Sequence, residues 1–353
     1  MRVLVGMSGG IDSSVAALLL QEAGHEVVGV TMSTWREENP FQGEFMQDAC
    51  FGPNQKEDIN EARRISERLG IEYHVIDCAK EYEEIVLSNF KDEYLAGRTP
   101  NPCVWCNSYI KFGALVSVAR QQGLAFDAFA TGHYANITFE DGRWLLHRGI
   151  DETKDQTYFL YRLTQKQLSE TLFPLGHLRK KEVKQLSIEK GFFTEQKGES
   201  QDFYKGDYSD LLGSPPQRGE IITSSGEIVG EHQGYWNYTI GQRRGLGVSA
   251  ENPLYVLSLD AEHNRVVVGG VEETFKEGLV ASKLNWIAFD HLTEPMEVVA
   301  KIRSTQKPKV ALITPIDEHS IEVKFAEKQK AITPGQSAVF YKDNVVLGGG
   351  VII

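Results

Sequence analysis

The sequence predicts an α/β protein: a doubly wound parallel-sheet domain, then a small β-rich central domain and a C-terminal β-barrel. In the first ~135 residues apolar, strand-like runs alternate with helical patterns, as in parallel sheets with crossover helices. A glycine turn joins the first strand to the first helix. Past about residue 205, short alternating segments separated by Gly, Pro and Asn favour small sheets and barrels. We expect domains at 1–205, 206–275 and 276–353.

The chain opens with a strand–turn–helix unit. Residues 2–7 form an apolar run of strand length, and residues 15–20 are an Ala- and Leu-rich helix former. Between them lies SGGIDSS (8–14), whose N–H groups and hydroxyls at a helix N-terminus predict an anion-binding cradle. No Lys follows the glycines as in a Walker loop, and the third glycine of the dinucleotide fingerprint is missing. An ordinary glycine turn is the alternative.

SGGxDS resembles the ATP-pyrophosphatase superfamily, in which this loop grips a pyrophosphate leaving group while the substrate is adenylated. Asp12 suits Mg²⁺, because this ion binds carboxylates beside phosphate oxygens. ATP and Mg²⁺ are therefore the expected cofactors.

Composition predicts a cytoplasmic protein but does not identify its partner. The 353 residues contain no apolar run of membrane-spanning length, so we expect no membrane partner. The predicted first strand begins at Arg2, so we expect no signal peptide. Four cysteines, two of them in C-x-x-C, fit a reducing cytoplasm. The net charge of −12 argues only weakly against nucleic acid, because basic clusters occur at 179–184, 243–244 and 301–309. Each cluster alone is more typical of a solvated face.

Three loops are expected to meet at the carboxyl edge of the parallel sheet, where ligands of such sheets bind: SGGIDSS (8–14), NPCVWCN (101–107) and TGHY (131–134). Met32 ends a predicted strand at the same edge, and residues 34–54, with Cys50, are expected to form a loop over the site. Two prolines predict that Cys103 and Cys106 lie at the tip of a loop rather than in a helix.

The C-x-x-C pair offers nucleophiles to displace AMP, because thiolates are reactive and a helix N-terminus, Arg98 or Lys111 would favour them. Unrelated cysteines and a redox pair are the alternatives. A zinc site is disfavoured, because there is no second C-x-x-C and no paired His. Cys78, at a strand end, is expected to be a packing cysteine.

Motifs along nearly the whole chain resemble the MnmA family of tRNA-uridine 2-sulfurtransferases. They are GMSGGIDS (6–13), GRTPNPCVWCN (97–107), TGHY (131–134), KDQTYFL (154–160), GEHQ (230–233), TIGQRRGLG (239–247) and TPGQSAVFY (333–341). The resemblance implies that the wobble uridine of tRNA is flipped into the site. ATP then adenylates its C2 oxygen, and sulfur from a protein-borne carrier displaces AMP to give 2-thiouridine.

The resemblance also implies site residues. ATP contacts fall at Gly6, Met7, Ser8, Gly9, Gly10, Ile11, Asp12, Ser13, Met32 and Gly132. The target-base loop falls at Asn101, Pro102 and Cys103. Contacts to tRNA fall at His133, Lys154, Asp155, Gln156, Arg303, Ser304 and Gln336. Cys106 aligns with the first catalytic cysteine, and Cys103 with a position that is often an acid.

One departure concerns the sulfur carrier. The family's second catalytic cysteine, which carries the persulfide, aligns with Tyr204, and a phenol cannot hold a persulfide. Three alternatives replace the relay: Cys103 as the partner of Cys106, Cys50 as that partner, or a [4Fe–4S] cluster on Cys50, Cys103 and Cys106, as in other tRNA-thiolating pyrophosphatases. We favour the cluster. The sulfur donor, a persulfide carrier fed by a cysteine desulfurase or sulfide itself, stays open.

Two other function classes compete with tRNA thiolation. An amidating or ligating enzyme would use SGGxDS but would need neither C-x-x-C nor two basic β modules. A nucleotide-sensing binding module would leave Asp12 and the cysteines idle. Analysis of 2-thiouridine in a strain that lacks the protein separates all three.

Overall fold

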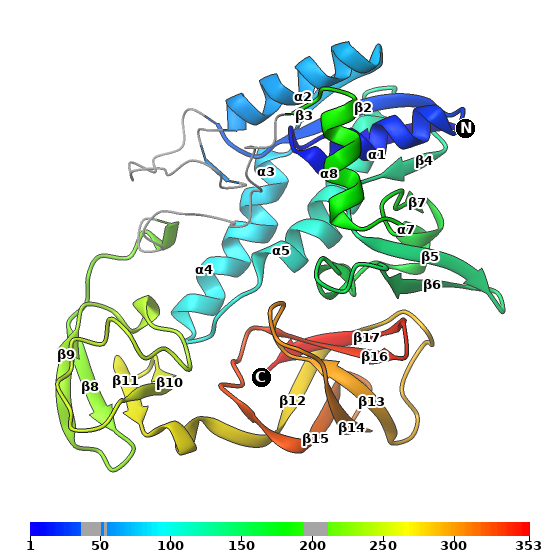
Figure 1. Cartoon of the computed structure of the whole chain (residues 1–353). Helices are drawn as coiled ribbons and strands as arrows, with labels where there is room; N and C mark the ends of the chain where they lie inside the picture. The colour runs from blue at the N-terminus through cyan, green and yellow to red at the C-terminus, as the bar shows by residue number, and fades with distance from the viewer. Residues whose placement is uncertain (37–50, 53–54, 194–210) are drawn as a thin grey trace.

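The computed structural model describes residues 1–36, 51–52, 55–193 and 211–353. Its first domain contains a parallel sheet in the order β3-β2-β1-β4-β7 (Figure 1). The strands are β1 (Arg2–Gly6), β2 (Glu26–Ser33), β3 (Glu72–Asp77), β4 (Ala128–Ala130) and β7 (Thr171–Leu172). The predicted parallel-sheet domain is confirmed.

Helices cover both faces of this sheet. Alternate residues of β1 show it, because Val3 and Val5 enter one apolar core and Leu4 enters another. The first core is shared with α1 (Ile11–Glu22), α2 (Gln55–Leu69) and α8 (Lys180–Glu189). The second is shared with α3 (Ala79–Tyr82), η1 (Glu83–Leu87), α4 (Ser88–Leu95), α5 (Pro102–Trp105), η2 (Cys106–Ala114) and α6 (Leu115–Gln121). Short segments η3 (Thr157–Phe159) and α7 (Gln165–Ser169) follow.

The cysteine-bearing segment differs from its prediction as a loop tip. A helix begins at Pro102 and continues through the π-helical η2, which starts at Cys106. Pro102 occupies the first helical position, where its missing N–H would have no partner within the helix in any case. The proline therefore starts this helix, and Cys103 and Cys106 lie one turn apart on it.

A hairpin of the first domain extends the sheet of the last one. Strands β5 (Ala135–Glu140) and β6 (Arg143–Arg148) are antiparallel, and β6 pairs with β17 (Val345–Ile352) of the barrel. Asp141 and Gly142 both have positive φ, the turn geometry that an Asp-Gly pair favours. This hairpin, which we did not predict, joins the two domains through backbone hydrogen bonds.

The two β modules follow in the predicted order (Figure 1). The central sheet has the order β10-β11-β8-β9, and a 3₁₀ turn, η4 (Tyr235–Asn237), lies between β9 and β10. Its strands are β8 (Gly219–Thr223), β9 (Ile228–His232), β10 (Tyr255–Asp260) and β11 (Arg265–Gly269), with η5 (Val271–Thr274) leading onward.

The barrel runs β12-β15-β14-β13-β16-β17 and closes through β12–β17 pairing. Its remaining strands are β12 (Phe275–Trp286), β13 (Met296–Lys301), β14 (Lys309–Pro315), β15 (Ser320–Lys330) and β16 (Ser337–Lys342). The predicted C-terminal barrel is confirmed. In the described part of the chain, no helix has the length and apolar character needed to cross a membrane.

Candidate functional site

The turn between β1 and α1 is braced by its own serines. The Ser13 hydroxyl accepts a hydrogen bond from the Ser8 backbone N–H at 3.1 Å and donates to the Gly10 carbonyl at 3.2 Å. The Ser14 hydroxyl donates to the same carbonyl at 2.8 Å. These bonds fix the turn in front of α1, so that the helix's first N–H groups are available to an anion.

Two glycines of the predicted ATP site are required by close contacts. Gly9 has φ +71°, and a Cβ there would lie 2.5 Å from the Asp58 carbonyl oxygen of α2. A Cβ on Gly132 would lie 2.7 Å from the Asp12 carbonyl carbon. The TGHY turn therefore lies directly against the cradle, as the topology predicted, and neither glycine tolerates a side chain.

The carboxyl end of β2 is hydrogen-bonded to Met7, the residue that precedes the glycine turn. The Met7 N–H donates to the Val30 carbonyl at 2.7 Å, and the Thr31 hydroxyl donates to the Met7 carbonyl at 2.6 Å. Met32, a predicted ATP contact, lies one residue further along β2, and its carbonyl accepts a bond from the Gln55 amide at 3.3 Å.

Asp12, the predicted Mg²⁺ ligand, is paired within the protein. The Lys180 Nζ lies 2.7 Å from Oδ1 and 2.8 Å from Oδ2 of this carboxylate. The Tyr134 hydroxyl donates to Oδ1 at 2.9 Å. Tyr134 is positioned in turn by Gln156, whose Oε1 accepts from the Tyr134 N–H at 2.9 Å.

Lys180 is the residue that sequence reasoning missed. We interpreted its basic cluster as a solvated face, and Arg179 and Lys181 are exposed, but Lys180 is only 7% exposed. As the first residue of α8 it also donates its backbone N–H to Asp151 Oδ2 at 2.9 Å. The sequence offers no signal that separates the middle residue of this cluster from its neighbours.

Cys103 and Cys106 are partly exposed, whereas Cys78 is fully buried. Burial raises the pKa of the Cys78 thiol to about 12, and the nearby charges of Glu81, Asp77 and Cys106 act in the same direction. The Cys78 N–H donates to the Ser33 carbonyl at 2.8 Å, at the carboxyl ends of β2 and β3. Helix α3, which begins directly after Cys78, contacts η2, and Cys106 is the first residue of η2. Cys106 therefore lies near the sheet edge that carries the cradle, and Cys78 is an unreactive packing thiol.

The residues that precede Cys103 are held by the barrel. The Thr99 N–H donates to the Pro334 carbonyl at 2.8 Å. The Gln336 amide donates to the Thr99 carbonyl at 3.1 Å and to the Pro100 carbonyl at 2.9 Å. Arg98, expected to favour a thiolate, is paired with Glu93 instead, and this pairing raises the pKa of Arg98.

His133 connects the cradle side with the cysteine side. Its ring lies near Phe112 of η2 and Phe173, with centroids 6.0 Å from each, and its Nδ1 lies 2.7 Å from the Thr131 hydroxyl. Burial, with a smaller contribution from the charge of Lys111, lowers the pKa of His133 well below its usual value. The imidazole is therefore neutral at physiological pH.

Other residues predicted to touch tRNA have partners inside the protein. The Asp155 carboxylate accepts from the Thr157 N–H at 3.2 Å and hydroxyl at 2.7 Å. Arg303 donates to the carbonyls of Ile240 and Ala331, at 3.0 and 3.2 Å, and to the Thr333 hydroxyl. Lys154 and Ser304 are partly exposed. Contact of all these residues with tRNA stays a prediction.

Two of the three cysteines proposed as iron–sulfur ligands lie in the described part of the chain. Cys103 and Cys106 lie one helical turn apart, but Cys50 and residues 197–204, which include Tyr204, fall outside the described residues. Among the residues that the structure does describe, no three His, Cys, Asp or Glu side chains group as metal ligands.

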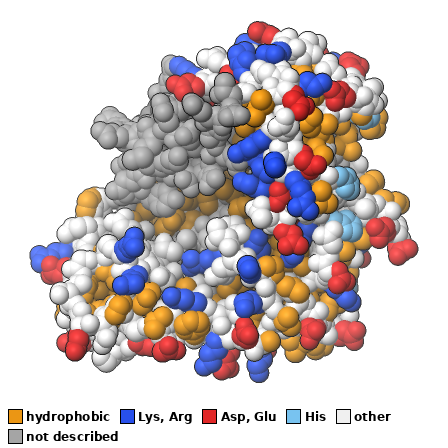
Figure 2. All heavy atoms as spheres, in the orientation of Figure 1, with side chains coloured by type: hydrophobic (Ala, Val, Ile, Leu, Met, Phe, Trp, Pro, Cys, Tyr) orange, Lys and Arg blue, Asp and Glu red, His pale blue; other side chains and the backbone are white. Residues whose placement is uncertain are grey.

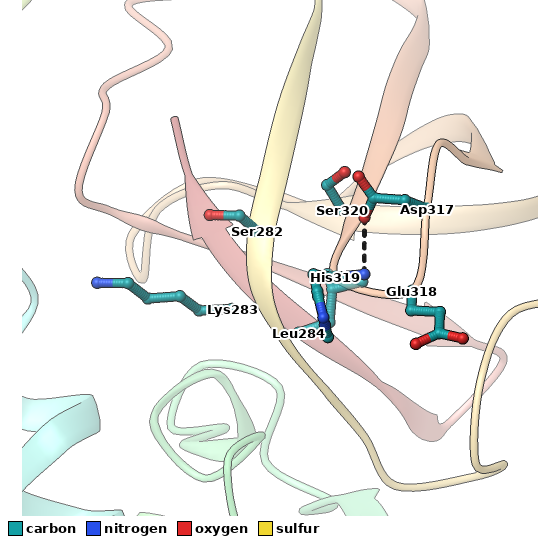
Figure 3. Close-up of a pocket in the computed structure, with 7 residues that line it drawn as sticks. All are labelled: Ser282, Lys283, Leu284, Asp317, Glu318, His319 and Ser320. Atoms are coloured by element: carbon teal, nitrogen blue, oxygen red, sulfur yellow. Dashed lines mark hydrogen bonds between the residues drawn. The ribbon is translucent and has the colours of Figure 1, made fainter.

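A further pocket lies in the barrel (Figure 3). It is lined by residues of β12, including Lys283, and by the β14–β15 turn, including Asp317 and His319. Its volume is about 430 Å³, and none of the predicted site residues lines it. It is therefore not the predicted nucleotide site.

Comparisons with known proteins agree with the architecture. Family models match residues 1–204 (tRNA methyl transferase HUP domain), 212–270 (tRNA methyl transferase PRC-barrel domain) and 276–352 (aminomethyltransferase beta-barrel domain). The tRNA-specific 2-thiouridylase MnmA of Endomicrobium trichonymphae is 48% identical, over 100% of this chain and 99% of that protein. The Symbiobacterium thermophilum protein of the same name is 47% identical, over 99% and 92%. The chain therefore belongs to the MnmA family of tRNA-specific 2-thiouridylases.

Proposed function

We propose that this protein is a tRNA thiolase that replaces the C2 oxygen of the wobble uridine with sulfur at the expense of ATP. The observation that carries the proposal is the position of two chemistries at one sheet edge. The phosphate cradle of residues 8–14 follows β1, and Cys106 begins η2, which contacts the helix that follows β3. An enzyme that only ligated or sensed a nucleotide would need no thiol there.

In the first step the uridine C2 oxygen attacks the α-phosphorus of ATP. A bond forms between that oxygen and phosphorus, the bond to the bridging oxygen breaks, and pyrophosphate leaves with its electron pair. The N–H groups at the start of α1 and the hydroxyl of Ser8 are suited to the departing charge. Mg²⁺ at Asp12 would neutralise the same charge, and a carboxylate beside phosphate oxygens fits this ion.

In the second step sulfur adds to C2, the bond from C2 to the adenylated oxygen breaks, and AMP leaves. With a persulfide on Cys106, the terminal sulfur forms the new bond to C2. Cys103, one turn away, then attacks the Cys106 sulfur and breaks the S–S bond. The resulting Cys103–Cys106 disulfide takes two electrons from an external dithiol before the next cycle.

A [4Fe–4S] cluster is the alternative that we favour. Two thiols on successive positions of one helix face, both partly exposed, fit the chemistry of such a centre. Cys103 and Cys106 would hold it together with Cys50. When bound it would supply an open iron position for sulfide, and no cysteine pair would be oxidised in each cycle.

The tRNA partner suits the distribution of charge despite the net charge of −12. Figure 2 shows Lys and Arg side chains, with some Asp and Glu among them, on the face of the molecule where the first domain meets the barrel. A locally basic surface is what phosphate groups require. A flipped uridine in an anticodon loop can then reach the sheet edge, with Asn101 and Pro102 beside it.

The test is mass spectrometry of tRNA nucleosides from a strain in which the gene is deleted. We expect 2-thiouridine to disappear and to return with the wild-type gene, but not with Cys106→Ser. Cys78→Ala is the matched control, because it removes a buried, unreactive thiol and should restore the nucleoside. Unchanged 2-thiouridine in the deletion strain, without a second gene for this reaction, would refute the proposal.

The cluster has its own test. Protein purified without oxygen should contain iron and sulfide and absorb near about 400 nm, as thiolate-bound iron–sulfur centres do. Cys103→Ser and Cys106→Ser should each lose iron, whereas Cys78→Ala should not. A colourless, iron-free protein with full thiolation activity would refute the cluster and leave a cysteine relay, with Cys103 or Cys50 as the partner of Cys106.

A further inference from the structure

Lys180 has a position that a surface lysine does not occupy. Its side chain is buried, and its ammonium lies within 2.8 Å of both carboxylate oxygens of Asp12. Its backbone is fixed by Asp151, so that the side chain extends from the first turn of α8 toward the cradle. Helix α8 packs against α1 in the same apolar core. The fold therefore brings a cation to the cradle from 168 residues away in the chain.

The cradle needs a cation that its own loop does not provide. Residues 8–14 contain serines, glycines and Asp12 but no Lys or Arg. A P-loop carries a lysine of its own for the β- and γ-phosphates of its nucleotide. Here the only charge in the turn is negative, and by itself it would repel pyrophosphate. Lys180 cancels this charge as long as the two side chains remain paired.

We propose that Lys180 binds the pyrophosphate moiety of ATP. In the nucleotide-free protein Lys180 is paired with Asp12, and Mg²⁺ binding to Asp12 releases the ammonium to the phosphates. When Mg·ATP enters, the carboxylate of Asp12 turns to the metal, and the ammonium moves from the carboxylate to the phosphate oxygens. A lysine suits this exchange, because its ammonium has three donors at the end of a flexible four-carbon stem. Tyr134, whose hydroxyl donates to Oδ1 of Asp12, still provides a hydrogen bond to this carboxylate after the ammonium leaves.

This inference rests on the proposed function for the identity of the ligand, but its test uses inorganic pyrophosphate alone. With Mg²⁺ present, Lys180→Met should weaken pyrophosphate binding about 10- to 100-fold, as expected for the loss of charge-assisted hydrogen bonds. Lys181→Met is the matched control, because Lys181 is the exposed neighbour on the same helix. Isothermal titration calorimetry measures both variants, and thermal unfolding checks that they are folded.

A titration without Mg²⁺ separates binding from positioning. If Lys180 binds pyrophosphate itself, Asp12→Asn releases it from this carboxylate and should tighten Mg²⁺-free binding about 3- to 10-fold, whereas Lys180→Met weakens it. If Lys180 only orients Asp12, Asp12→Asn and the double variant Asp12→Asn/Lys180→Met bind Mg²⁺-free pyrophosphate equally. The double variant removes both charges of the pair, so it covers the case in which Lys180→Met does not fold. It should bind pyrophosphate more weakly than Asp12→Asn alone.

Failure of this inference differs from failure of the proposed function. Wild-type pyrophosphate affinity in Lys180→Met, with normal 2-thiouridine in cells, overturns the role of Lys180 and leaves the thiolase. If Lys180→Met weakens pyrophosphate binding but the wild-type protein makes no 2-thiouridine, the role of Lys180 stands and the thiolase is refuted. Affinity of the variants within about twofold of the wild type, with and without Mg²⁺, counts as failure.

Discussion

The cradle and the cysteine helix lie at the same sheet edge but are held in place by different means. The cradle of residues 8–14 is built within one β–α unit, and bonds among Ser8, Gly10, Ser13 and Ser14 close it. The segment that leads to Cys103 is bonded from outside, by the Pro334 carbonyl and the Gln336 side chain of the barrel. The bonds that close the cradle lie within its own loop, whereas the bonds that hold the cysteine segment come from another domain.

The central domain also contributes to the second region. The Tyr235 hydroxyl donates to the Leu95 carbonyl at 2.7 Å, at the end of α4. Gly97 follows with φ +72°, and a Cβ there would lie 3.1 Å from the Leu259 carbonyl oxygen. Both β domains therefore touch the chain just before the cysteines. We therefore expect nucleotide activation to be less sensitive than sulfur transfer to changes in the barrel.

The largest expected effect is in the cradle. Asp12→Asn removes the carboxylate proposed for Mg²⁺ and its ion pair with the Lys180 ammonium. We expect AMP formation in the presence of tRNA to fall about 10²- to 10³-fold, the range for loss of one preorganised electrostatic group. Chromatography of labelled nucleotide measures it. Wild-type AMP formation at saturating Mg²⁺ would contradict the role of Asp12, and tRNA affinity is the control because Asp12 is not a predicted tRNA contact.

Cys106→Ser should separate the two regions. The cradle is untouched, so tRNA-dependent AMP formation should persist, but 2-thiouridine should fall below detection because a serine hydroxyl carries no sulfur and is a poor iron ligand. The two products are measured in one reaction. Loss of both together would mean that activation also requires the cysteine helix, and the comparison above would have to be abandoned.

The same difference decides what the sequence could reveal. The cradle was predictable because SGGIDSS is contiguous between a strand and a helix. The helix at Pro102 was missed because proline was interpreted as a breaker rather than as a first helical residue. The β5–β6 hairpin had a signal in Asp141-Gly142 that we did not use. Lys180 had none, because only tertiary packing distinguishes it from Lys181.

A smaller effect is expected from Gln336→Met, which removes both side-chain bonds to Thr99 and Pro100 at similar volume. Two lost hydrogen bonds should lower the rate of sulfur transfer about 5- to 30-fold. AMP formation should change less, because the bonds that close the cradle come from its own serines and not from Gln336. Amide hydrogen exchange should rise at Thr99, whose N–H is bonded to Pro334. If Gln336 served only to bind tRNA, the exchange of the free protein would not change.

The smallest effect concerns His133, which lies between the two regions. Burial lowers its pKa in the folded state, so below pH 6.5 the unfolded chain binds a proton that the folded chain does not. Stability therefore falls as pH falls, by up to about 1.4 kcal/mol per pH unit from this one residue.

The variant His133→Gln has no imidazole to titrate, so its loss of unfolding free energy between pH 7.5 and about 5 should be smaller than in the wild type. Urea unfolding at both pH values measures the difference. His25→Gln provides the comparison, because His25 directly precedes β2, at the end of the strand opposite to the sheet edge of the site. An equal pH dependence in His133→Gln and the wild type would show that His133 takes up its proton in the folded protein, and the contact between η2 and the TGHY turn would then survive the charge.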